Sequence, residues 1–497
     1  MKLSELLIKA NLHYDKLNLI DHNVHKISIN SKDINKDDIF VALCGNNKDG
    51  HQFIDEVIEK GCQTIIFEDP YYRLKDLVDV NLIKVSDTKK ALGILSHCYY
   101  DEPSQQMDLV GVTGTNGKTT ITTLIHHLYQ LLGIPSTLIG TNGIYRSKEY
   151  FPTENTTPNS LVINEVLSQS LAEDINHGVM EVSSIAIKEQ RITQIDFDTM
   201  IYTNFSLDHL DYHKTYDDYF YNKVLAFAYL GNHYQRNKLA IINGDDEYAK
   251  KFLNFIQVKC FTYGLTEEND FRARNIVCDL SYLSFDLYYR NELLTSIKTS
   301  QLFGFFNIYN LLAVLSFFYL KGYDLSLITE QINHIDKVKG RFEKVQTDFP
   351  IHVFVDFAHT PKSVYKVLEE VKLITKQRVI TVLGCGGDRD KTKRPIMGKI
   401  ATQHSDFTIF TSDNPRSEDP LLIIDDMLKG VCSDEFIVIP DRKQAIQYAI
   451  SEASQEDLIL ILGKGHEDYQ LINGIKYYFN DYNVALKAIE MRFMEEK

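Results

Sequence analysis

The segment Gly111–Thr120, with the sequence GVTGTNGKTT, has the residue types of a phosphate-binding loop. An apolar stretch predicts a strand, the glycines predict a tight turn, and Lys118 and Thr119 stand where a helix would begin. Backbone N–H groups at a helix start suit phosphate oxygens, a lysine can reach the β- and γ-phosphates, and a threonine hydroxyl can hold Mg²⁺. Val112 stands where the strict form of the motif has its first glycine. The alternative is an ordinary strand–turn–helix with a capping threonine.

Two further segments place possible metal ligands after predicted strands. Glu181 ends an apolar stretch in the sequence EVSS, and Asp208 and His209 follow the next apolar strand in TNFSLDHLDYH. Carboxylate and imidazole groups at strand ends near a phosphate loop favour a divalent-cation site. The alternatives are a helix cap for Glu181 and a purely structural role for the histidine.

Lys223 lies within the apolar stripe of a predicted helix, three residues after Phe220. Most lysines on such a face extend to solvent. A buried lysine would instead have a lowered pKa, and its neutral amine could react with CO₂ to give an anionic carbamate. The periodicity of the sequence leaves both readings open.

Two asparagines and one arginine are further candidates for nucleotide contacts. Asn307 and Asn310 precede an apolar helical stretch, where they could cap the helix or offer their amides to a base. Arg341, in the sequence GRFE, could direct a cation at phosphates, or it could be an ordinary surface residue. The residues alone leave these alternatives open.

The elements that must position these residues are short apolar strands separated by helical stretches, which is typical of parallel α/β sheets. The predicted strands are 38–43, 64–67, 109–112, 178–182, 199–202, 239–242, 353–355, 379–383, 407–411, 436–439 and 458–462. Residues 272–300 alternate instead and predict a small antiparallel patch. The last five strands form a doubly wound pattern, and the sequences DFAHTP, GCGGDRD, SDNPR, PDR and GKGHE at their carboxyl ends predict a binding face.

The composition indicates a multi-domain cytoplasmic protein. The chain has 497 residues, of which 44% are hydrophobic and 24% charged, and its net charge is -15. That charge disfavours nucleic acid as a partner. No stretch approaches the roughly 20 apolar residues of a membrane span, and the N-terminus lacks the pattern of a secretion signal. Seven scattered cysteines without a CxxC pair argue against disulfides and against a zinc site.

Taken together, the motifs resemble the Mur ligase family of ATP-dependent amide-forming enzymes. The matching sequences run from about residue 25 to the C-terminus: GTNGKTT, EVSS, TNFSLDHLDYH, NGDD, GFFNIYN, GRFE, DFAHTP, GCGGDRD, DNPR and GKGHE. The resemblance implies an α/β fold of three domains: an N-terminal α/β UDP-sugar-binding domain (1–103), a central P-loop ATPase domain with a parallel sheet (104–334) and a C-terminal Rossmann-like domain that binds the amino acid (335–497). It also implies ATP and Mg²⁺ as cofactors. We further expect a monomer that does not insert into membranes.

The resemblance assigns roles to individual residues. The implied catalytic residues are Lys118, Lys223, Glu181 and His209, and the implied magnesium ligands are Thr119, Glu181, His209 and Lys223, the last as N6-carboxylysine. The implied ATP contacts are Gly114, Thr115, Asn116, Gly117, Lys118, Thr119, Thr120, Asn307, Arg341 and Asp356. The UDP-MurNAc-dipeptide would be bound by Ser31, Asp49, Gly50, His51, Thr156, Thr157, Ser183 and Arg191. The amino acid would be bound by Arg389, Asp413, Asn414, Pro415, Arg416, Gly463 and Glu467.

Within the family, the chain is most similar to the members that add the third amino acid of the peptidoglycan stem. The implied reaction joins meso-diaminopimelate to UDP-N-acetylmuramoyl-L-alanyl-D-glutamate through an acyl phosphate. Members that use meso-diaminopimelate carry the motif DNPR, whereas lysine users typically lack its arginine, which is Arg416 here. Arginine can bind the second carboxylate of diaminopimelate in a bidentate manner, and it would repel the terminal ammonium of lysine.

Three places depart from the family pattern. Asn30-Ser31-Lys32 stands for Asp-Ser-Arg, Ile185 for a histidine and Glu189 for a glutamine. The alternatives to the implied function are a lysine-adding ligase of the same family, a ligase similar to folylpolyglutamate synthase and a nucleotide-binding regulator without catalysis. The DGH, GCGGDRD and DNPR sequences disfavour a ligase similar to folylpolyglutamate synthase. The joint presence of the four implied catalytic residues disfavours the third.

Overall fold

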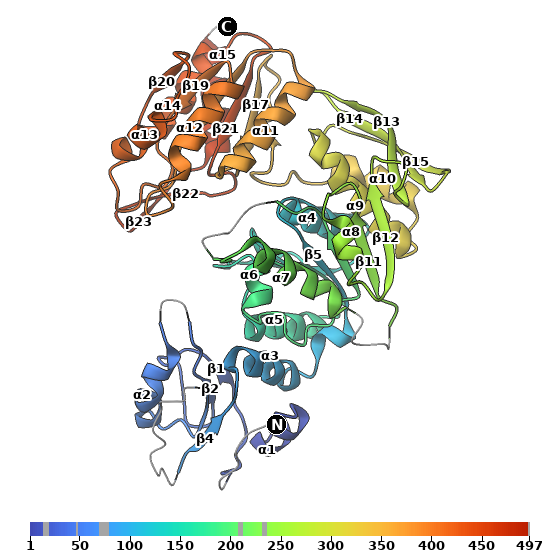
Figure 1. Cartoon of the computed structure of the whole chain (residues 1–497), viewed down its shortest axis with the longest axis vertical. Helices are drawn as coiled ribbons and strands as arrows, with labels where there is room; N and C mark the ends of the chain where they lie inside the picture. Colours follow the sequence, from blue (N-terminus) through green and yellow to red (C-terminus); the bar gives the residue numbers. More distant parts are fainter. Residues whose placement is uncertain (13–18, 46–47, 69–78, 207–211, 231–235, 496–497) are drawn as a thin grey trace. The chain divides into compact units, whose positions relative to one another are not determined.

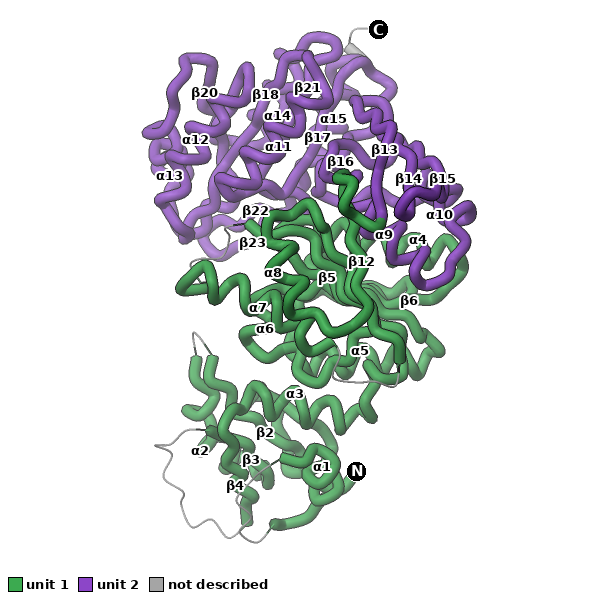
Figure 2. Tube along the Cα trace, turned by 45° about the vertical axis from the view of Figure 1, so that its right-hand side comes forward, with its two compact units in different colours: residues 1–270 green, residues 271–497 purple. Residues whose placement is uncertain are grey.

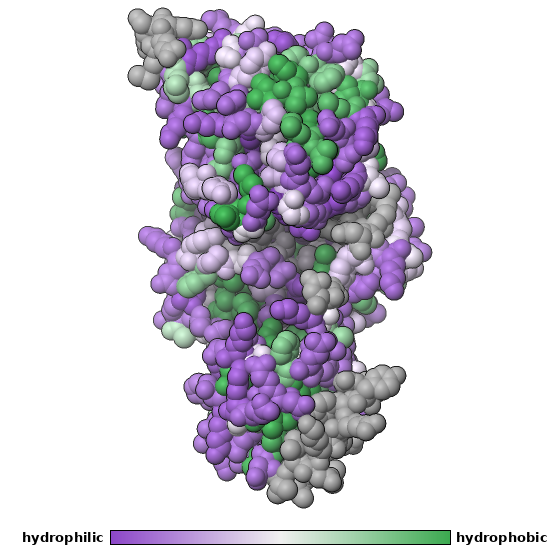
Figure 3. Space-filling model, turned by 90° about the vertical axis from the view of Figure 1, so that its left-hand side faces the viewer, coloured by the Kyte–Doolittle hydropathy of each residue, from purple (hydrophilic) through white to green (hydrophobic). Residues whose placement is uncertain are grey.

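The computed structural model describes residues 1–12, 19–45, 48–68, 79–206, 212–230 and 236–495. The chain divides into two compact units, Met1–Asp270 and Phe271–Lys497 (Figure 2). The domain boundaries predicted near residues 103 and 334 stay predictions. Among the described residues, no helix has both the length and the apolar character that crossing a bilayer requires. Hydrophilic residues cover most of the face seen in Figure 3, in keeping with the charged composition.

The first unit begins with a four-stranded parallel sheet in the order β1-β2-β3-β4 (Figure 1). Its strands are β1 (Ile27–Ser28), β2 (Ile39–Val41), β3 (Thr64–Phe67) and β4 (Asn81–Lys84), and its helices are α1 (Leu3–Lys9), the 3₁₀ turn η1 (Gly50–Phe53), α2 (Ile54–Glu59) and α3 (Thr88–Tyr99). Strands β2 and β3 are buried along their whole length, so each reads as a continuous apolar run rather than as an alternation. The predicted strands 38–43 and 64–67 are confirmed.

A larger sheet follows in the same unit, in the order β12-β11-β10-β5-β9-β6-β7-β8. The strands are β5 (Asp108–Thr113), β6 (Ser136–Gly140), β7 (Gly143–Arg146), β8 (Glu149–Phe151), β9 (His177–Glu181), β10 (Thr199–Tyr202), β11 (Leu239–Asn243) and β12 (Lys259–Gly264). The helical elements are η2 (Pro103–Gln106), α4 (Lys118–Leu131), α5 (Ser160–Ala172), α6 (Ser184–Lys188), α7 (Tyr216–Ala228) and α8 (Ala249–Leu253). The strands from β12 to β6 are parallel, as predicted, and β7 and β8 add an antiparallel edge that we did not predict.

The second unit begins with an antiparallel meander of β13 (Phe271–Cys278), β14 (Leu283–Tyr289) and β15 (Glu292–Thr299), which confirms the predicted antiparallel patch. Helices α9 (Phe305–Leu320) and α10 (Leu325–Gln331) and the 3₁₀ turn η3 (Ile332–His334) follow. Helix α9 is apolar around most of its circumference and is buried accordingly.

The rest of this unit is a six-stranded sheet in the order β16-β17-β21-β18-β19-β20. Its strands are β16 (Glu343–Lys344), β17 (His352–Asp356), β18 (Val379–Leu383), β19 (Phe407–Phe410), β20 (Phe436–Val438) and β21 (Leu458–Leu462), and its helices are α11 (Pro361–Ile374), α12 (Lys393–His404), α13 (Pro420–Leu428), α14 (Arg442–Glu452) and α15 (Asp481–Glu495). All pairs are parallel except β16 with β17. The five predicted strands and their doubly wound order are therefore confirmed. A separate hairpin of β22 (Tyr469–Ile472) and β23 (Ile475–Tyr478) was not predicted.

A buried ion pair joins the starts of α14 and α15 at the carboxyl end of β21. The guanidinium of Arg442 donates to the Asp481 carboxylate through Nε (2.8 Å) and Nη2 (2.7 Å), and both side chains are completely buried. Nη2 of the same arginine also donates to the backbone oxygen of Leu462 at 3.0 Å. Two hydrogen bonds in a fork geometry satisfy charges that would be costly to bury alone.

Replacing Asp481 should destabilise the second unit strongly. Asp481→Ala is expected to lower the free energy of unfolding by about 3–5 kcal/mol, because the guanidinium of Arg442 would stay buried without its partner. Urea unfolding followed by circular dichroism measures the loss. Asp419→Ala, which removes only the exposed cap of α13, serves as control and should cost about 1 kcal/mol. Equal losses in the two variants would contradict the structural role of the ion pair.

Candidate active site

The predicted phosphate loop is a strand–turn–helix, as the sequence indicated. Strand β5 ends at Thr113 and helix α4 begins at Lys118. Gly114 and Gly117 between them have φ angles of +148° and +90°, which side chains rarely allow. A Cβ on Gly114 would lie 1.8 Å from Oγ1 of Thr203, so the end of β10 closes on the loop and admits only glycine there.

Residues after β10 hold the loop through its backbone. The N–H of Thr115 donates to the backbone oxygen of Asn204 (2.8 Å), and the N–H of Asn116 donates to Oδ1 of Asn204 (3.1 Å). Oγ1 of Thr203 donates in return to the backbone oxygen of Asn116 (2.6 Å). The TNFS sequence thus shapes the loop, a role that we did not predict from the motif.

Two lysines converge on one backbone oxygen of the loop. Nζ of Lys118 and Nζ of Lys223 each donate to the backbone oxygen of Gly114 at 2.9 Å. Lys223 is only 1% exposed, and its Nζ lies 4.7 Å from the centre of the Tyr219 ring. The reading in which Lys223 extends to solvent is therefore wrong: α7 turns this face toward the loop, and the local hydrogen bond replaces water.

The structure brings Thr119 and Glu181 together. Oγ1 of Thr119 donates to Oε2 of Glu181 at 3.0 Å, and the Glu181 carboxylate also accepts from the N–H and the hydroxyl of Thr141 (2.8 and 3.2 Å). Hydroxyl and carboxylate oxygens are ligands that suit Mg²⁺. The predicted ligand His209, with its neighbour Asp208, lies outside the described residues. Within the described part of the chain, no three His, Cys, Asp or Glu residues cluster as a metal site would require.

A buried histidine links the two helices next to the loop. Nε2 of His213 lies 3.0 Å from Oγ of Ser184 at the start of α6, and Nδ1 lies 3.3 Å from Oδ2 of Asp218 in the first turn of α7. The same helix places the hydroxyl of Tyr219 3.1 Å from Oγ1 of Thr115 in the loop. Helix α7 is therefore fixed on two sides. The TNFSLDHLDYH motif contains His213, but nothing in its spacing shows these contacts.

The predicted substrate contacts fall into two groups. In the N-terminal sheet, Nδ1 of His51 lies 2.6 Å from the Asp49 carboxylate, while its Nε2 accepts the N–H of Glu68 at 2.9 Å. The imidazole proton is therefore assigned to Nδ1. Gly50 lies where a Cβ would be 2.7 Å from the N of Leu43. His51 thus supports its own loop rather than presenting a free ring.

The neighbouring Ser31 is anchored through its backbone oxygen, which accepts from Nζ of Lys60 at 2.8 Å. The adjacent departure from the family pattern is local in effect, since Oδ1 of Asn30 accepts the N–H of Lys32 at 3.1 Å.

The second group comes from the residues that precede α5 and from those that flank α6. Oγ1 of Thr157 donates to the backbone oxygen of Glu181 (2.7 Å) and accepts the N–H of Ser183 (3.1 Å). Arg191 donates to the backbone oxygen of Thr157 at 2.9 Å, and the hydroxyl of Thr156 lies 3.0 Å from that of Thr141. The predicted dipeptide contacts of this second group and the predicted magnesium ligand Glu181 are therefore one connected network.

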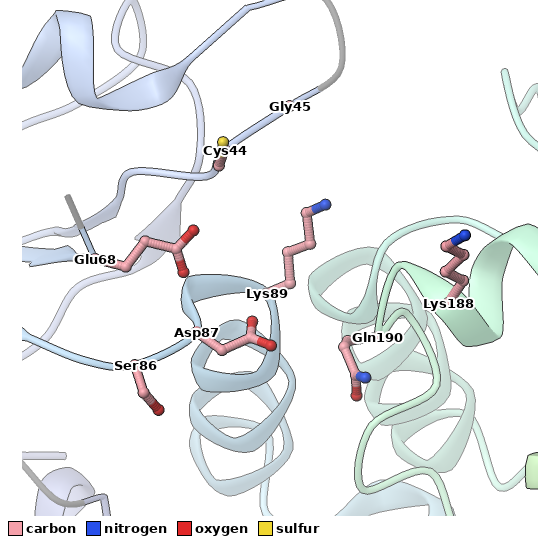
Figure 4. Close-up of a pocket in the computed structure, with 8 residues that line it drawn as sticks. All are labelled: Cys44, Gly45, Glu68, Ser86, Asp87, Lys89, Lys188 and Gln190. Carbon is pink, nitrogen blue, oxygen red and sulfur yellow. The ribbon is translucent and has the colours of Figure 1, made fainter. Parts of the chain in front are cut away.

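A cavity of about 400 Å³ lies between residues that flank these two groups (Figure 4). It is lined by polar and charged side chains from the N-terminal sheet, the start of α3 and the end of α6: Cys44, Gly45, Glu68, Ser86, Asp87, Lys89, Lys188 and Gln190. Its two lysines are matched by two acidic residues of the same lining, Glu68 and Asp87. None of the predicted dipeptide residues is part of the lining itself.

Glu189, which stands where the family pattern has a glutamine, is paired beside this cavity. Its Oε2 lies 2.5 Å from Nζ of Lys89, and Oε1 accepts the hydroxyl of Tyr212. Burial raises the pKa of Glu189, but the hydrogen bonds from Lys89 and Tyr212 outweigh it and hold the pKa below its usual value. The extra carboxylate is therefore charged and matched by a cation from α3. Ile185 is the second residue of α6.

The predicted nucleotide contacts of the second unit lie around α9 and β17. Asn307 is buried on α9, where its Nδ2 donates to the backbone oxygen of Phe303 (2.7 Å) and its Oδ1 accepts from Asn310 (2.8 Å). Asp356 ends β17. Burial raises the pKa of Asp356, and the nearby Arg341 acts in the opposite direction. The charge of Arg341 thus acts on the Asp356 carboxylate, and Asn307 is held by internal hydrogen bonds.

The predicted acceptor residues gather at the carboxyl ends of β19 and β21. Nδ2 of Asn414 donates to Oε2 of Glu467 at 2.8 Å, and a Cβ on Gly463 would lie 2.5 Å from the Asp413 carboxylate. Arg416 is half-buried, and its Nη1 donates to the backbone oxygen of Gly387 at 2.6 Å. The loops that follow these two strands are therefore in contact, and the binding face predicted at the strand ends stays a prediction.

Two further residues belong to the description of this site, and the acceptor role predicted for the first, Arg389, stays a prediction. Arg389 is exposed on its loop and makes no hydrogen bond to the other predicted acceptor residues in the described part of the chain. Lys464, to which we assigned no role, is completely buried among them. The sequence shows that Lys464 belongs to the GKGHE motif, but it does not show that Lys464 contacts Asn414, which is 50 residues away in the chain.

Three segments of the chain match domains of one enzyme family. They are described as the Mur ligase family catalytic domain (residues 23–100), the Mur ligase middle domain (112–317) and the Mur ligase glutamate ligase domain (340–465). The resemblance that the motifs indicated is thereby confirmed.

Individual proteins agree with these domains. The UDP-N-acetylmuramoyl-L-alanyl-D-glutamate–2,6-diaminopimelate ligases of Geobacillus thermodenitrificans and Lactiplantibacillus plantarum are both 39% identical to this chain. The alignments cover 94% and 95% of this chain and 95% of each relative. A solved structure of a ligase of the same name superimposes with a TM-score of 0.69 at 28% identity and covers 95% of both chains. The protein therefore belongs to the Mur ligase family and has its three-domain α/β fold.

Proposed function

We propose that this protein joins meso-diaminopimelate to UDP-N-acetylmuramoyl-L-alanyl-D-glutamate during the synthesis of peptidoglycan precursors. As a Mur ligase, it is an ATP-dependent, ADP-forming amide ligase that works with Mg²⁺. The observation that carries the choice of acceptor is the cluster in which Glu467, Asn414 and Arg416 combine a carboxylate, an amide and a guanidinium. We place the reaction in the cytoplasm and assign it to a monomer.

The phosphate loop supports the first step, in which the γ-phosphoryl group of ATP moves to the free D-glutamate carboxylate. A carboxylate oxygen attacks phosphorus, the bond to ADP breaks, and an acyl phosphate forms. Loop N–H groups and Lys118 would bind the phosphates, with Lys118 exchanging its bonds to the backbone oxygens of Gly114 and Thr115 for phosphate oxygens. Thr119, Glu181, His209 and carbamylated Lys223 would hold Mg²⁺, which supplies charge neutralisation there.

The acceptor cluster supports the second step, in which an amino group of diaminopimelate attacks the acyl carbon and phosphate leaves. The other end of diaminopimelate carries both an ammonium and a carboxylate. Glu467 and Arg416 offer the opposite charges, so the two ends of the acceptor are told apart and the reacting amine is left free. Lysine has only an ammonium at its far end, and the half-buried guanidinium of Arg416 would then face it unpaired.

An assay with both acceptors tests the proposal. The protein, ATP, Mg²⁺ and the UDP-dipeptide should release phosphate with meso-diaminopimelate, and kcat/KM should exceed that for L-lysine by about 10- to 100-fold, since one charge-assisted interaction is at stake. A higher kcat/KM with L-lysine would contradict the acceptor assignment. An absence of phosphate release with either amino acid would contradict the whole proposal.

Arg416→Ala should impair diaminopimelate use selectively. We expect KM for diaminopimelate to rise about 10- to 100-fold, because the second carboxylate loses a charge-assisted partner. Steady-state kinetics with each substrate varied in turn measure the change, and KM for ATP should stay within about twofold. Arg378→Ala, which removes a guanidinium from the same sheet away from this cluster, is the matched control. An equal effect in both variants would rule out a specific contact.

Lys223→Met should remove a carbamate signal as well as activity. Wild-type protein equilibrated with ¹³C-bicarbonate is expected to show a carbamate resonance by ¹³C NMR, and Lys223→Met should lack it. Activity should fall by at least about 100-fold, because the charge that the carbamate brings to the metal site would be lost. Lys238→Met, at another buried lysine, should retain the resonance. A wild-type spectrum without the signal would show that the amine stays unmodified.

A further inference from the structure

Lys464 occupies the centre of the proposed acceptor site, although its side chain is completely buried. Burying an ammonium is costly unless all its N–H groups are paired. Its Nζ lies 3.1 Å from Oδ1 of Asn414, 3.1 Å from Oε2 of Glu467 and 2.5 Å from the backbone oxygen of Tyr469. These three acceptors match the three donors of an ammonium group. The charge is therefore built into the site.

The first consequence concerns Asn414, whose amide is oriented by its neighbours. Its Oδ1 accepts from Lys464 and from the N–H of Leu471 (2.9 Å), and its Nδ2 donates to Glu467. Turning the amide over would set an NH₂ group against an ammonium, so the lysine fixes its direction. Oε2 of Glu467 then receives two donors, whereas its Oε1 has no hydrogen bond to any described residue. That oxygen is the one positioned to accept an acceptor ammonium.

The second consequence concerns the backbone of Arg416, which β22 holds. The N–H of Arg416 donates to the backbone oxygen of Leu471 (2.9 Å), and the N–H of Asn473 donates to the backbone oxygen of Arg416 (2.7 Å). Arg416 has a φ of +54°, a conformation that non-glycine residues adopt at a cost. The contacts of Lys464 with Tyr469 and, through Asn414, with Leu471 secure the strand that maintains it.

We propose that Lys464 is a positioning residue of the acceptor site, whose buried ammonium orients Asn414 and Glu467 and, through β22, the backbone of Arg416. The proposal rests on the proposed function and deepens it. In this proposal Lys464 places the carboxylate of Glu467 and the guanidinium of Arg416 without touching the acceptor itself. The preference for an acceptor with both an ammonium and a carboxylate at its far end follows from that placement.

Lys464→Met tests this role, because methionine keeps an unbranched apolar side chain and removes the charge. We expect KM for meso-diaminopimelate to rise about tenfold or more, with the preference over L-lysine reduced. The acyl phosphate formed without acceptor, trapped with hydroxylamine, should appear at a rate within about twofold of wild type. Lys476→Met is the matched control, since that exposed lysine lies over the Tyr469 ring on the same hairpin (4.4 Å) but outside the buried network.

A second variant separates positioning from folding. In a Glu467→Gln background, Lys464→Met should change KM for the acceptor less than in wild type, since the charge that the lysine orients is already gone. Thermal unfolding of each variant shows whether the chain is folded. Unchanged acceptor KM in folded Lys464→Met, or equal loss of acyl-phosphate formation and acceptor use, would overturn the proposal.

The outcome is distinguishable from failure of the proposed function. Wild-type turnover with meso-diaminopimelate tests the proposed function before any variant is compared. A crystal structure of Lys464→Met tests the positioning role of Lys464, whatever the acceptor proves to be. Displacement of the Asn414 amide and of the Arg416 backbone is the expected result, and an unchanged Asn414–Glu467 hydrogen bond would refute the positioning role.

Discussion

The pairing register of β5 between β9 and β10 is the constraint on which the first unit depends. It sets Val112 opposite Glu181 and Thr113 opposite Tyr202, so three strands end side by side. The phosphate loop, the carboxylate beside Thr119 and the residues that shape the loop all follow from that alignment. A shift of one residue would turn the Glu181 carboxylate to the other face of the sheet and separate it from Thr119.

Charges in this protein are buried where they organise something else. Arg442 and Asp481 tie two helices to the end of β21, and Lys464 ties two loops together at the same edge of the sheet. Arg442 and Lys464 each have several hydrogen-bond partners, which reduces the cost of burying their charges. The edge at which we propose that the amino acid binds thus has a buried, hydrogen-bonded base, whereas Oε1 of Glu467 has no hydrogen bond to any described residue.

The strands and the phosphate loop could be predicted because their signals are local. Apolar runs such as 379–383 and 458–462 became strands with the same bounds, and the glycines around Asn116 gave the turn. The environment of Lys223 could not be predicted, since the stripe of α7 faces a loop more than 100 residues earlier in the chain. The environments of His51, whose ring accepts the N–H of Glu68, and of Lys464 could not be predicted either. Sequence spacing shows which residues are present, and tertiary contacts decide which atoms remain available.

The backbone oxygen of Gly114 accepts hydrogen bonds from both Lys118 and Lys223, and this arrangement has an electrostatic consequence. Two ammonium groups directed at one carbonyl repel each other, and the dipole between them relieves part of that repulsion. A carbamate on Lys223 would keep an N–H on the same nitrogen, so the bond to the carbonyl could persist while the group changed from positive to negative. Lys118 would then gain an attractive neighbour. Carbamylation of Lys223 would thus reverse the sign of the charge beside Lys118.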